Sequence, residues 1–501
     1  MATVLERPTG ESPQTGPRAG RKEFVVVGAG LGGLATALRL AHRGHGVTVL
    51  EAAPQIGGRN RRIQVGECTF DGGPSLMMML EPFRRLYADV GERLEDHLDL
   101  TLCEPSYRVR FGDGSTLDGT PNVARMVQQI ERLMGREEAE RYGELLGDLA
   151  SLYRDAIPNF VRRNYDSVLD LASPKAVGLV LKHRMLHNLA KRIRQYHKDP
   201  RLHQLFSFQT MYLGLSPYDA PWVYAVLTYM EYGEGIWHPK GGMARIHESV
   251  AELAQARGAI IRTSSPVRRI EGRRVELESG EVITADAVVC NADLPHAEKT
   301  LVAEPRTKER RYSCSALVMY IDYEGALPAM PHHNIFFGGD FEGNLQAIFR
   351  APLSLPPDPA FYACISKRSD PDAAPEGHEN LFVLVPCPNN DYPWTEADRD
   401  GLVAHVYDRL GREVGFDPAR VRAIAFNGPS EWAGEYRLDK GAAFGLAHDF
   451  LQSVCFRPKN VDPKDDRLFY VGASTAPGNG LPMVLIGAEL AEERLVRAGL
   501  A

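Results

Sequence analysis

Three glycines near the start of the chain have the spacing of a phosphate-binding turn. Gly28, Gly30 and Gly33 follow an apolar run at residues 24–27 and precede a helical apolar pattern. In such a unit the glycines permit a tight turn and close packing, and the helix N-terminus presents free amides to phosphate. Glu51 ends the next predicted strand, where its carboxylate can accept hydrogen bonds from ribose hydroxyls. The spacing predicts a βαβ unit that binds a dinucleotide.

A second glycine pair and an arginine favour FAD over a nicotinamide dinucleotide. Gly57, Gly58 and Arg59 follow Glu51 closely along the chain. A nicotinamide-binding domain does not need this extension, whereas a longer, buried flavin dinucleotide requires further amides and a cation at its pyrophosphate. The alternative is a surface loop with a solvated arginine. We expect Gly57, Gly58 and Arg59 to contact FAD.

The C-terminal part of the chain repeats the order of strand, glycine-rich turn and helix. A predicted strand at residues 468–471 leads into Gly472, and a predicted helix starts with Pro482 and Met483. Proline is favoured in the first helical turn, whose unpaired amides face whatever lies beyond it. In a flavoprotein these amides would stabilise negative charge developing on the pyrimidine edge of the flavin ring. We therefore expect Gly472, Pro482 and Met483 to contact the cofactor.

These motifs, together with others along the chain, resemble those of a known family. The sequence is similar to the FAD-dependent amine-oxidase-like flavoproteins and, within them, to the carotenoid (phytoene) desaturases. The segment 471–482 looks like the family's flavin-side motif and is the most specific part of the resemblance. The likeness also runs through residues 70–74, 206–229, 234–243, 285–293, 333–336, 370–377 and 445–458. One departure is Ala476, where the family pattern predicts a histidine.

The resemblance implies a reaction and one further contact to the cofactor. It places Val267 where adenine lies against the backbone, although simple core packing explains this residue equally well. It implies an FAD-dependent carotenoid desaturase that introduces conjugated double bonds into a C40 polyene by hydride transfer to flavin. Tyr212, Asp219 and His333 are candidates to accept the proton, and no residue is assigned as catalytic. No second strand-framed glycine fingerprint for NAD(P)H is present, so quinone or oxygen is the expected electron acceptor.

Three alternatives remain open at this point. The substrate of such a desaturase could be a later intermediate, namely zeta-carotene, neurosporene or a hydroxylated carotenoid. A flavin oxidase or saturase acting on another hydrophobic lipid or on an amine is the second alternative. The third is a prenyl-binding escort protein on the same fold, but such proteins lack an intact glycine fingerprint, whereas Gly28, Gly30 and Gly33 are all present here.

One segment is rich in aromatic residues, as a substrate channel would be. Between residues 206 and 229 there are seven aromatic side chains: Phe206, Phe208, Tyr212, Tyr218, Trp222, Tyr224 and Tyr229. Aromatic and methionine-rich surface is more often plain core. The family resemblance nevertheless implies that this segment forms the wall of a tunnel for a long polyene.

A basic amphipathic helix is predicted over residues 174–198. Lysines and arginines recur on it without an acidic residue, and apolar residues recur every four positions from Val177 to Ile193. Such a helix can lie in a membrane interface, where each basic residue contributes about 1 kcal/mol near anionic lipid. The alternative is a solvated helix whose apolar stripe packs on its own domain. We expect this segment to make a peripheral membrane contact.

Composition excludes several classes of function. The chain has 501 residues and a net charge of −7, so binding to nucleic acid is not expected. Residues 1–21 are predicted to be a disordered tail without a secretory signal, and no apolar run is long and unbroken enough to span a bilayer. Metal-ligand spacing is missing and the cysteines are spread singly, so we predict no metal site and reduced thiols in a cytoplasmic protein at the inner membrane face. The cysteines are Cys68, Cys103, Cys290, Cys314, Cys364, Cys387 and Cys455.

The order of predicted elements indicates a mixed α/β and α+β fold. Strand and helix patterns of the dinucleotide-binding type return in the middle and at the end of the chain. We predict a discontinuous Rossmann-type FAD-binding domain from residues 22–85, 238–300 and 461–501. Residues 86–237 and 301–460 are predicted to form a sheet-plus-helix domain for substrate and membrane docking.

Overall fold

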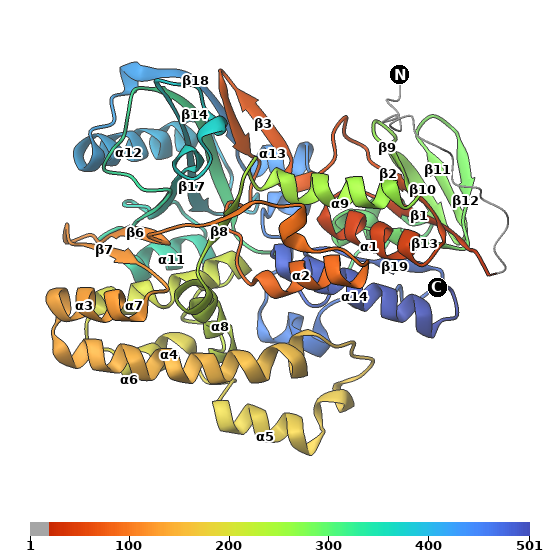
Figure 1. Ribbon diagram of the computed structural model, residues 1–501, viewed down its shortest axis with the longest axis horizontal. Helices are drawn as coiled ribbons and strands as arrows, with labels where there is room; N and C mark the ends of the chain where they lie inside the picture. Colours follow the sequence, from red (N-terminus) through yellow and green to blue (C-terminus); the bar gives the residue numbers. More distant parts are fainter. Residues whose placement is uncertain (1–19) are drawn as a thin grey trace.

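The protein has a parallel sheet at one end, a mixed sheet at the other and a layer of helices along one edge (Figure 1). The computed structural model describes residues 20–501. The predicted tail, residues 1–21, lies outside the described residues except for its last two.

Three distant parts of the chain form the five-stranded parallel sheet. The N-terminal βαβ unit supplies its middle, because β1 pairs with β2 on one side and with β13 on the other. The strand order is β19-β13-β1-β2-β9, with bounds Leu468–Tyr470, Ala287–Cys290, Glu23–Val27, Gly46–Leu50 and Ile260–Arg262. All pairings in this sheet are parallel, and parallel strands end in turns at one shared edge.

Both faces of the parallel sheet are covered, which explains why its strands are almost wholly apolar. One face packs against three helices: α1 (Leu31–His42), α9 (Ala244–Ala256) and α14 (Leu481–Arg497). The other face packs against a three-stranded sheet of β10 (Val267–Glu271), β11 (Arg274–Leu277) and β12 (Val282–Thr284). The sheet is therefore a rigid base for the turns at its carboxyl edge.

The second sheet has seven strands. Its order is β18-β14-β17-β16-β15-β6-β7, and only β15 and β6 pair in parallel. The bounds are Val421–Asn427, Ser315–Glu324, His378–Cys387, Phe361–Ile365, His333–Phe336, Tyr107–Arg110 and Thr116–Gly119. Helix α12 (Glu396–Val414) packs on one face, and part of the other face meets the helical layer.

Two short antiparallel pairs run between these sheets. They are β3 (Arg62–Val65) with β4 (Cys68–Asp71), and β5 (Leu100–Leu102) with β8 (Trp237–Pro239). The remaining α-helices outside the helical layer are α2 (Leu80–Asp89), α10 (Leu294–His296), α11 (Phe341–Phe349) and α13 (Pro429–Gly434). Together with the sheets, these elements confirm the predicted mixed α/β and α+β fold.

The helical layer begins with two consecutive helices, α3 (Val123–Met134) and α4 (Arg136–Ala156). Gly135 separates them with a φ of +97°, a backbone conformation that glycine adopts without strain. The layer also holds α7 (Pro200–Leu205) and α8 (Val226–Tyr229).

The predicted basic helix at 174–198 is wrong as a single helix. The structure has α5 (Pro174–His183) and α6 (Leu189–Tyr196), separated by a turn that starts at Arg184 with a φ of +51°. The turn forms because its backbone pairs with another segment: the Trp222 amide donates to the His187 carbonyl oxygen over 2.6 Å, and the Leu189 amide donates to that of Ala220 over 2.9 Å.

The two helices use their apolar residues differently. In α6, Leu189, Ala190 and Ile193 are buried against the helical layer. In α5, Val177 and Leu181 are exposed, at 46% and 72%. The alternative of a helix that packs on its own domain therefore describes α6, and α5 alone keeps the exposed apolar side chains. Within the described chain, no helix is long and apolar enough to cross a membrane.

Candidate cofactor and substrate site

One cavity of about 840 Å³ joins the carboxyl edge of the parallel sheet to the helical layer. Its lining includes ten of the eleven residues that the sequence assigned to the cofactor: Gly28, Gly30, Glu51, Gly57, Gly58, Arg59, Val267, Gly472, Pro482 and Met483. The eleventh, Gly33, lies behind the turn, where a side chain would overlap the carbonyl oxygen of Gly28. These residues come from four separate stretches of chain that the fold brings together.

The glycine turn after β1 leaves backbone amides open to the cavity. Gly28 has a φ of +98°, and a Cβ on Gly30 would lie 2.7 Å from Nδ2 of Asn291. Gly30 is the N-cap of α1, and no side chain among the described residues caps this helix. The first helical turn contains no acidic residue either. The N-terminal partial positive charge of α1 is therefore available to an anion.

Glu51 is held at the end of β2 by the backbone. Its Oε2 accepts a hydrogen bond from the Ala29 amide over 2.7 Å, and its Oε1 accepts one from the Ala53 amide over 2.9 Å. An ionised carboxylate offers about four acceptor positions, so each oxygen can accept a further hydrogen bond. The carboxylate thus has a fixed position and the capacity to bind hydroxyl groups in the cavity.

Arg59 places a partly buried positive charge in the lining of the cavity. Its Nη1 donates to the Ala443 carbonyl oxygen over 3.0 Å, and burial lowers the pKa of the guanidinium, an effect that nearby Asp293 partly offsets. Asp293 accepts a hydrogen bond from the Ser474 hydroxyl over 2.7 Å. Burial raises the pKa of the Asp293 carboxyl, and Arg59 opposes that rise. Asp293 is a lining residue that sequence reasoning missed.

The second helix N-terminus in the cavity is that of α14. Gly480 is its N-cap with a φ of +100°, Pro482 lies in its first turn, and no described side chain caps it. Residues 471–484 all line the cavity. Two uncapped helix N-termini, from opposite ends of the chain, therefore face the same space.

A buried arginine holds the turn that precedes α14. Nη2 of Arg457 donates to the Ala473 carbonyl oxygen over 2.6 Å, and its Nη1 donates to that of Ala447 over 2.9 Å. The side chain is 2% exposed, and burial lowers its pKa to about 10. Sequence reasoning missed Arg457, because an arginine in a loop gives no signal of burial.

His448 lies beside the loop where the sequence departs from the family pattern at Ala476. Its Nε2 accepts a hydrogen bond from the Asn479 amide over 3.4 Å, and its Nδ1 lies 3.2 Å from the Leu213 carbonyl oxygen. Burial lowers the pKa of His448 well below its usual value, so the ring is neutral. Nδ2 of Asn479 also donates to the Tyr212 carbonyl oxygen over 2.6 Å. These contacts attach the aromatic segment to the turn before α14.

The aromatic segment divides between cavity wall and core. Phe208, Tyr212 and Tyr224 line the cavity, together with Met211, Leu213, Val223, Val226, Leu227 and Met230. Phe206 and Trp222 are fully buried in the core of the helical layer instead. Tyr218 and Tyr229 pack against that core and do not line the cavity. The segment therefore supplies both cavity wall and core.

The three candidate proton acceptors lie in different environments. Tyr212 lines the cavity. Asp219 lies outside it and pairs with Arg350 over 3.0 Å, with almost half of its side chain exposed. His333 is buried behind the wall, where its Nδ1 lies 2.7 Å from the hydroxyl oxygen of Tyr362. Of the three, only Tyr212 is placed to meet a molecule in the cavity.

Comparison with known proteins also indicates a flavin-binding protein. The sequence matches the family described as flavin-containing amine oxidoreductase over residues 31–486. The chain belongs to that family. It is 40% identical to the zeta-carotene-forming phytoene desaturase of Myxococcus xanthus, over 95% of this chain and 94% of the relative. It is 34% identical to the phytoene desaturase of Neurospora crassa, over 95% and 84% of the two chains.

The fold has relatives among solved structures. An oxidoreductase from Methanosarcina mazei superposes with a TM-score of 0.63 at 18% identity, over 94% of this chain and all of the other. At that identity the likeness speaks for the fold alone. Family membership and fold confirm the predicted FAD-dependent oxidoreductase.

FAD fits the residues that line the cavity. The two uncapped helix N-termini and Arg59 can bind the anionic part of a dinucleotide, and Glu51 can bind its ribose. Gly30 and Gly58 line the cavity and carry no side chain, so their backbone can approach the cofactor closely. The chain binds FAD, and these are the residues we assign to it.

Replacing Arg59 by Met is expected to weaken FAD binding. Hydrogen bonds to charged groups contribute about 1.5–3 kcal/mol, so the Kd for FAD should rise about 10- to 100-fold. Titration of the deflavinated protein with FAD, followed by fluorescence, measures this change. Arg59→Lys should fall between, because it keeps the charge and loses the two-pronged geometry. Arg84→Met, at a half-exposed site, is the control, and equal affinities in all four proteins would contradict the assignment.

Proposed function

We propose that this protein is an FAD-dependent carotenoid desaturase of the phytoene desaturase type, which introduces conjugated double bonds into a C40 polyene. The names of its relatives point to this substrate class. The observation that carries the proposal is the cavity, since a single space extends from the dinucleotide-binding residues to an apolar, aromatic wall.

The chemistry of that wall suits a hydrocarbon better than an amine. With the exception of Arg163, lining residues from the helical layer are apolar or aromatic, for example Ile157, Phe160, Phe208, Met211 and Leu227. Among the described lining residues from 156 to 230, none is Asp or Glu, so a cationic amine would meet no carboxylate there. Apolar burial contributes about 25 cal/mol per Å², and a long polyene has much surface to bury. This favours a polyene over the amine-oxidase alternative.

The reaction also needs a group that accepts a proton. When bound, FAD supplies the two-electron acceptor that takes up the hydride removed from the substrate. The chain must then remove a proton from the neighbouring carbon. Tyr212 is the polar wall residue next to the turn before α14, because Asn479 of that turn donates to its carbonyl oxygen. We propose that its hydroxyl takes this proton.

A hydrogen-bonded chain leads from Tyr212 to a buried carboxyl. The hydroxyl oxygens of Tyr212 and Tyr107 are 3.1 Å apart, and the Tyr107 hydroxyl donates to Oε1 of Glu231 over 3.1 Å. Gln209 donates to the other oxygen of Glu231 over 2.8 Å. As the substrate C–H bond breaks, its proton binds Tyr212, whose own proton passes to Tyr107 while that of Tyr107 passes to Glu231. The electron pair of the broken bond forms the new double bond.

Glu231 makes this step dependent on pH. Burial raises the pKa of its carboxyl to about 8, and its titratable neighbours are the tyrosines Tyr107, Tyr212 and Tyr232. Below that pH the folded protein holds Glu231 protonated, and only the ionised form can accept the proton. We expect the rate of flavin reduction by phytoene to rise with pH through about 8.

The variant Glu231→Gln should reduce the rate about 100-fold or more and remove this rise, which single-turnover flavin bleaching would measure. A second readout is stability, since a carboxyl whose pKa is raised in the folded state stabilises the protein most at low pH and less as the pH increases through about 8. The melting temperature of Glu231→Gln should therefore fall less between pH 5 and 9 than that of the wild type. Glu144→Gln, at an exposed position of α4, is the control. An unchanged pH–rate profile in Glu231→Gln would rule out the relay.

The reaction itself is tested with phytoene in liposomes. The FAD-loaded enzyme, supplied with a quinone or with oxygen as the proposed electron acceptor, should convert colourless phytoene into a product that absorbs visible light. Colour from zeta-carotene or neurosporene but not from phytoene would select the later-intermediate alternative. Peroxide from amines, with no product from any of these polyenes, would refute the proposed function.

A membrane contact near the cavity is the second part of the proposal. Nine of the thirteen exposed large apolar side chains in the described part of the chain lie in two neighbouring stretches, residues 168–186 and 450–456. We call them the apolar rim: Val168, Leu169, Val177, Leu181, Leu186, Phe450, Leu451, Val454 and Phe456. The two stretches pack together, and Val454 also lines the cavity.

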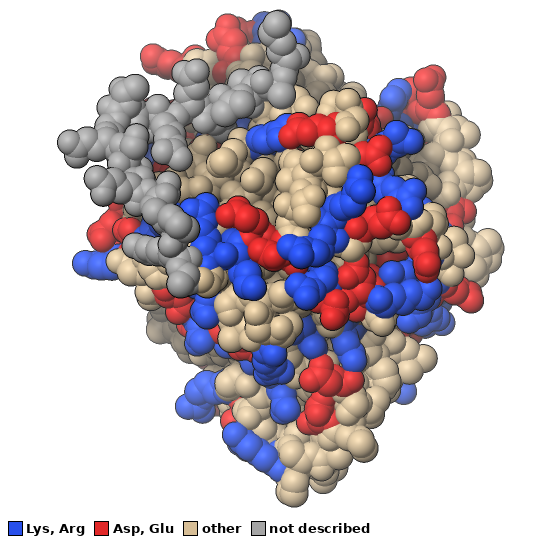
Figure 2. All heavy atoms as spheres, turned by 90° about the vertical axis from the view of Figure 1, so that its right-hand side faces the viewer, with Lys and Arg blue, Asp and Glu red and all other residues tan. Residues whose placement is uncertain are grey.

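The position and charge of the apolar rim suit the surface of an anionic bilayer. Helix α5 projects from the lower edge of the molecule in Figure 1, and Figure 2 shows basic side chains beside uncharged ones at this lower tip. Lys175, Lys182 and Arg184 are exposed on or beside α5. A peripheral contact here, at the inner face of the cytoplasmic membrane, would bring the cavity to the lipid phase where the substrate dissolves.

Replacing leucines of the apolar rim by aspartate should release the protein from lipid. We expect Leu169→Asp combined with Leu181→Asp to weaken binding to phosphatidylglycerol vesicles at least about tenfold. The reason is that burial of each leucine side chain in the bilayer contributes about 1.5–3 kcal/mol to the binding free energy. Co-sedimentation measures this binding. Val282→Asp, an exposed apolar residue outside the rim, is the control. Equal sedimentation of both variants and the wild type would contradict the contact.

A further inference from the structure

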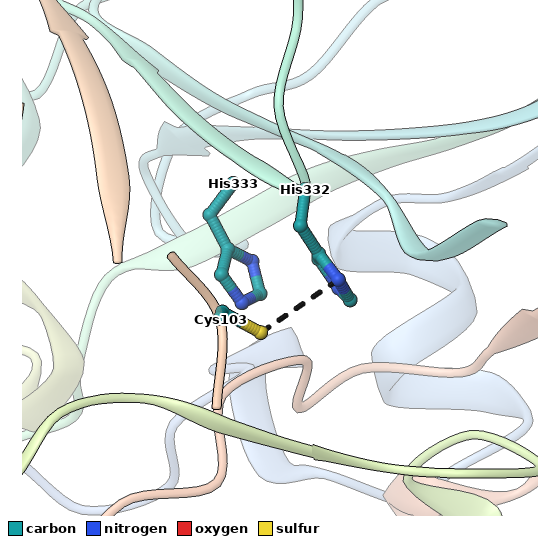
Figure 3. Close-up of side chains that lie close together, drawn as sticks. All are labelled: Cys103, His332 and His333. Atoms are coloured by element: carbon teal, nitrogen blue, oxygen red, sulfur yellow. Dashed lines mark hydrogen bonds between the residues drawn. The ribbon is translucent and has the colours of Figure 1, made fainter. Parts of the chain in front are cut away.

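A group of imidazoles and a thiol lies buried outside the cavity and has no part in the proposed reaction. Cys103 follows β5 and His238 lies in β8, whereas His332 immediately precedes β15 and His333 is its first residue. Their exposures are 2%, 1%, 4% and 0%. Figure 3 shows the side chains of Cys103, His332 and His333 converging on one point. The sequence offered no sign of this group, because its members come from three separate segments.

The distances in the group match those of a metal site. One ligand atom from each of Cys103, His332 and His333 lies within 4.8 Å of the others, and Sγ of Cys103 is 3.7 Å from Nδ1 of His332. Tetrahedral zinc binds sulfur at about 2.3 Å and imidazole nitrogen at about 2.0–2.1 Å, which places the two ligand atoms about 3.6 Å apart. Small side-chain rotations would complete this geometry.

Several ring nitrogens of the group have no partner. Both nitrogens of His238, Nε2 of His332 and Nε2 of His333 are buried without a hydrogen bond to any described residue. Buried polar groups are nearly always satisfied, so a group of this kind calls for an ion or water.

The surroundings complete the site. The hydroxyl of Ser369 lies 2.7 Å from Nδ1 of His332 and 3.9 Å from Sγ of Cys103, so a small rotation lets it donate to a thiolate. The rings of His238 and His332 are 4.7 Å apart between centroids. Asp370, next in sequence to Ser369, is buried, and its Oδ1 has no partner among the described residues.

The second group of possible ligands in the described chain is different. Cys68 and His378 both contact Oδ1 of Asp322, over 3.3 Å and 2.6 Å, and Oδ2 of Asp322 accepts from the Glu67 amide over 2.9 Å. These polar atoms already satisfy one another. Cys68 is therefore a matched control for Cys103, since both are buried cysteines beside a histidine-containing group.

We propose that Cys103, His332 and His333 bind one zinc ion, with His238 next to the fourth position. Thiolate and imidazole are ligands that suit zinc. On binding, the Sγ–metal bond replaces the S–H bond and the thiol proton leaves to solvent. The ion would join β5 and β8 to the edge of β15, and so fix the link between the two parts of the fold.

The ion would also orient one wall of the cavity. With Nε2 of His333 bound to metal, its proton sits on Nδ1 and is donated to the hydroxyl oxygen of Tyr362, 2.7 Å away. Tyr362 and Ser75 line the cavity, and the Ser75 hydroxyl lies 2.9 Å from the same oxygen. This role does not depend on the proposed reaction, so failure of the desaturase assay leaves the zinc site unaffected.

Metal analysis of the FAD-loaded protein tests the proposal. Untagged protein from zinc-supplemented medium should contain about one zinc per chain by mass spectrometry, also after gel filtration. Cys103→Ser and His333→Asn should each lose it, whereas Cys68→Ser should retain it. FAD content shows which variants fold. Less than about a tenth of an equivalent in the wild type, or equal zinc in Cys103→Ser and the wild type, would overturn the assignment.

Cobalt provides a measurement that does not depend on those variants. Wild-type protein produced with cobalt in place of zinc should show the d–d absorption of a tetrahedral ion with a thiolate ligand, at wavelengths longer than the flavin bands. Cobalt that binds without these bands, or the same bands in Cys103→Ser, would place the metal elsewhere and refute the site.

Discussion

The structure is organised around two helix N-termini that have no caps of their own. The first amides of α1 and α14 face one cavity, and no described side chain supplies the acceptors that such amides normally have. Their partial positive charges, with that of Arg59, would repel one another in an empty low-dielectric space. An anionic cofactor removes this conflict. The parallel sheet, whose carboxyl edge carries both helix starts, is what keeps the two N-termini in position.

The sequence predicted the lining residues at the dinucleotide end of the cavity far better than those at its apolar end. The roles proposed for Gly28, Glu51 and Arg59 depend on local spacing, because turn, helix start and strand end follow one another along the chain. The roles proposed for Arg457 and Glu231 depend on burial and on partners far away in the sequence. A loop arginine and a glutamate look the same in a sequence whether they are solvated or enclosed, so no local pattern could have found them.

The basic segment shows how tertiary contacts override a regular pattern. The four-residue apolar repeat from Val177 to Ile193 suggests one helix, but the backbone at His187 and Leu189 pairs with residues 220–222 instead. The helix therefore ends at His183, and the apolar residues of α6 turn inward. The repeat predicted helix correctly on both sides of this break. It could not predict the break, because the partner segment lies some thirty residues away along the chain.

The apolar rim touches the cavity through Val454. A hydrocarbon that enters beside such a rim passes from lipid to protein without crossing water, so its transfer carries no hydration cost. The amount of substrate that such an enzyme meets is then a surface density and not a bulk concentration. Adding inert lipid would lower this surface density at constant volume, and the rate of the enzyme would follow the mole fraction of polyene in the leaflet.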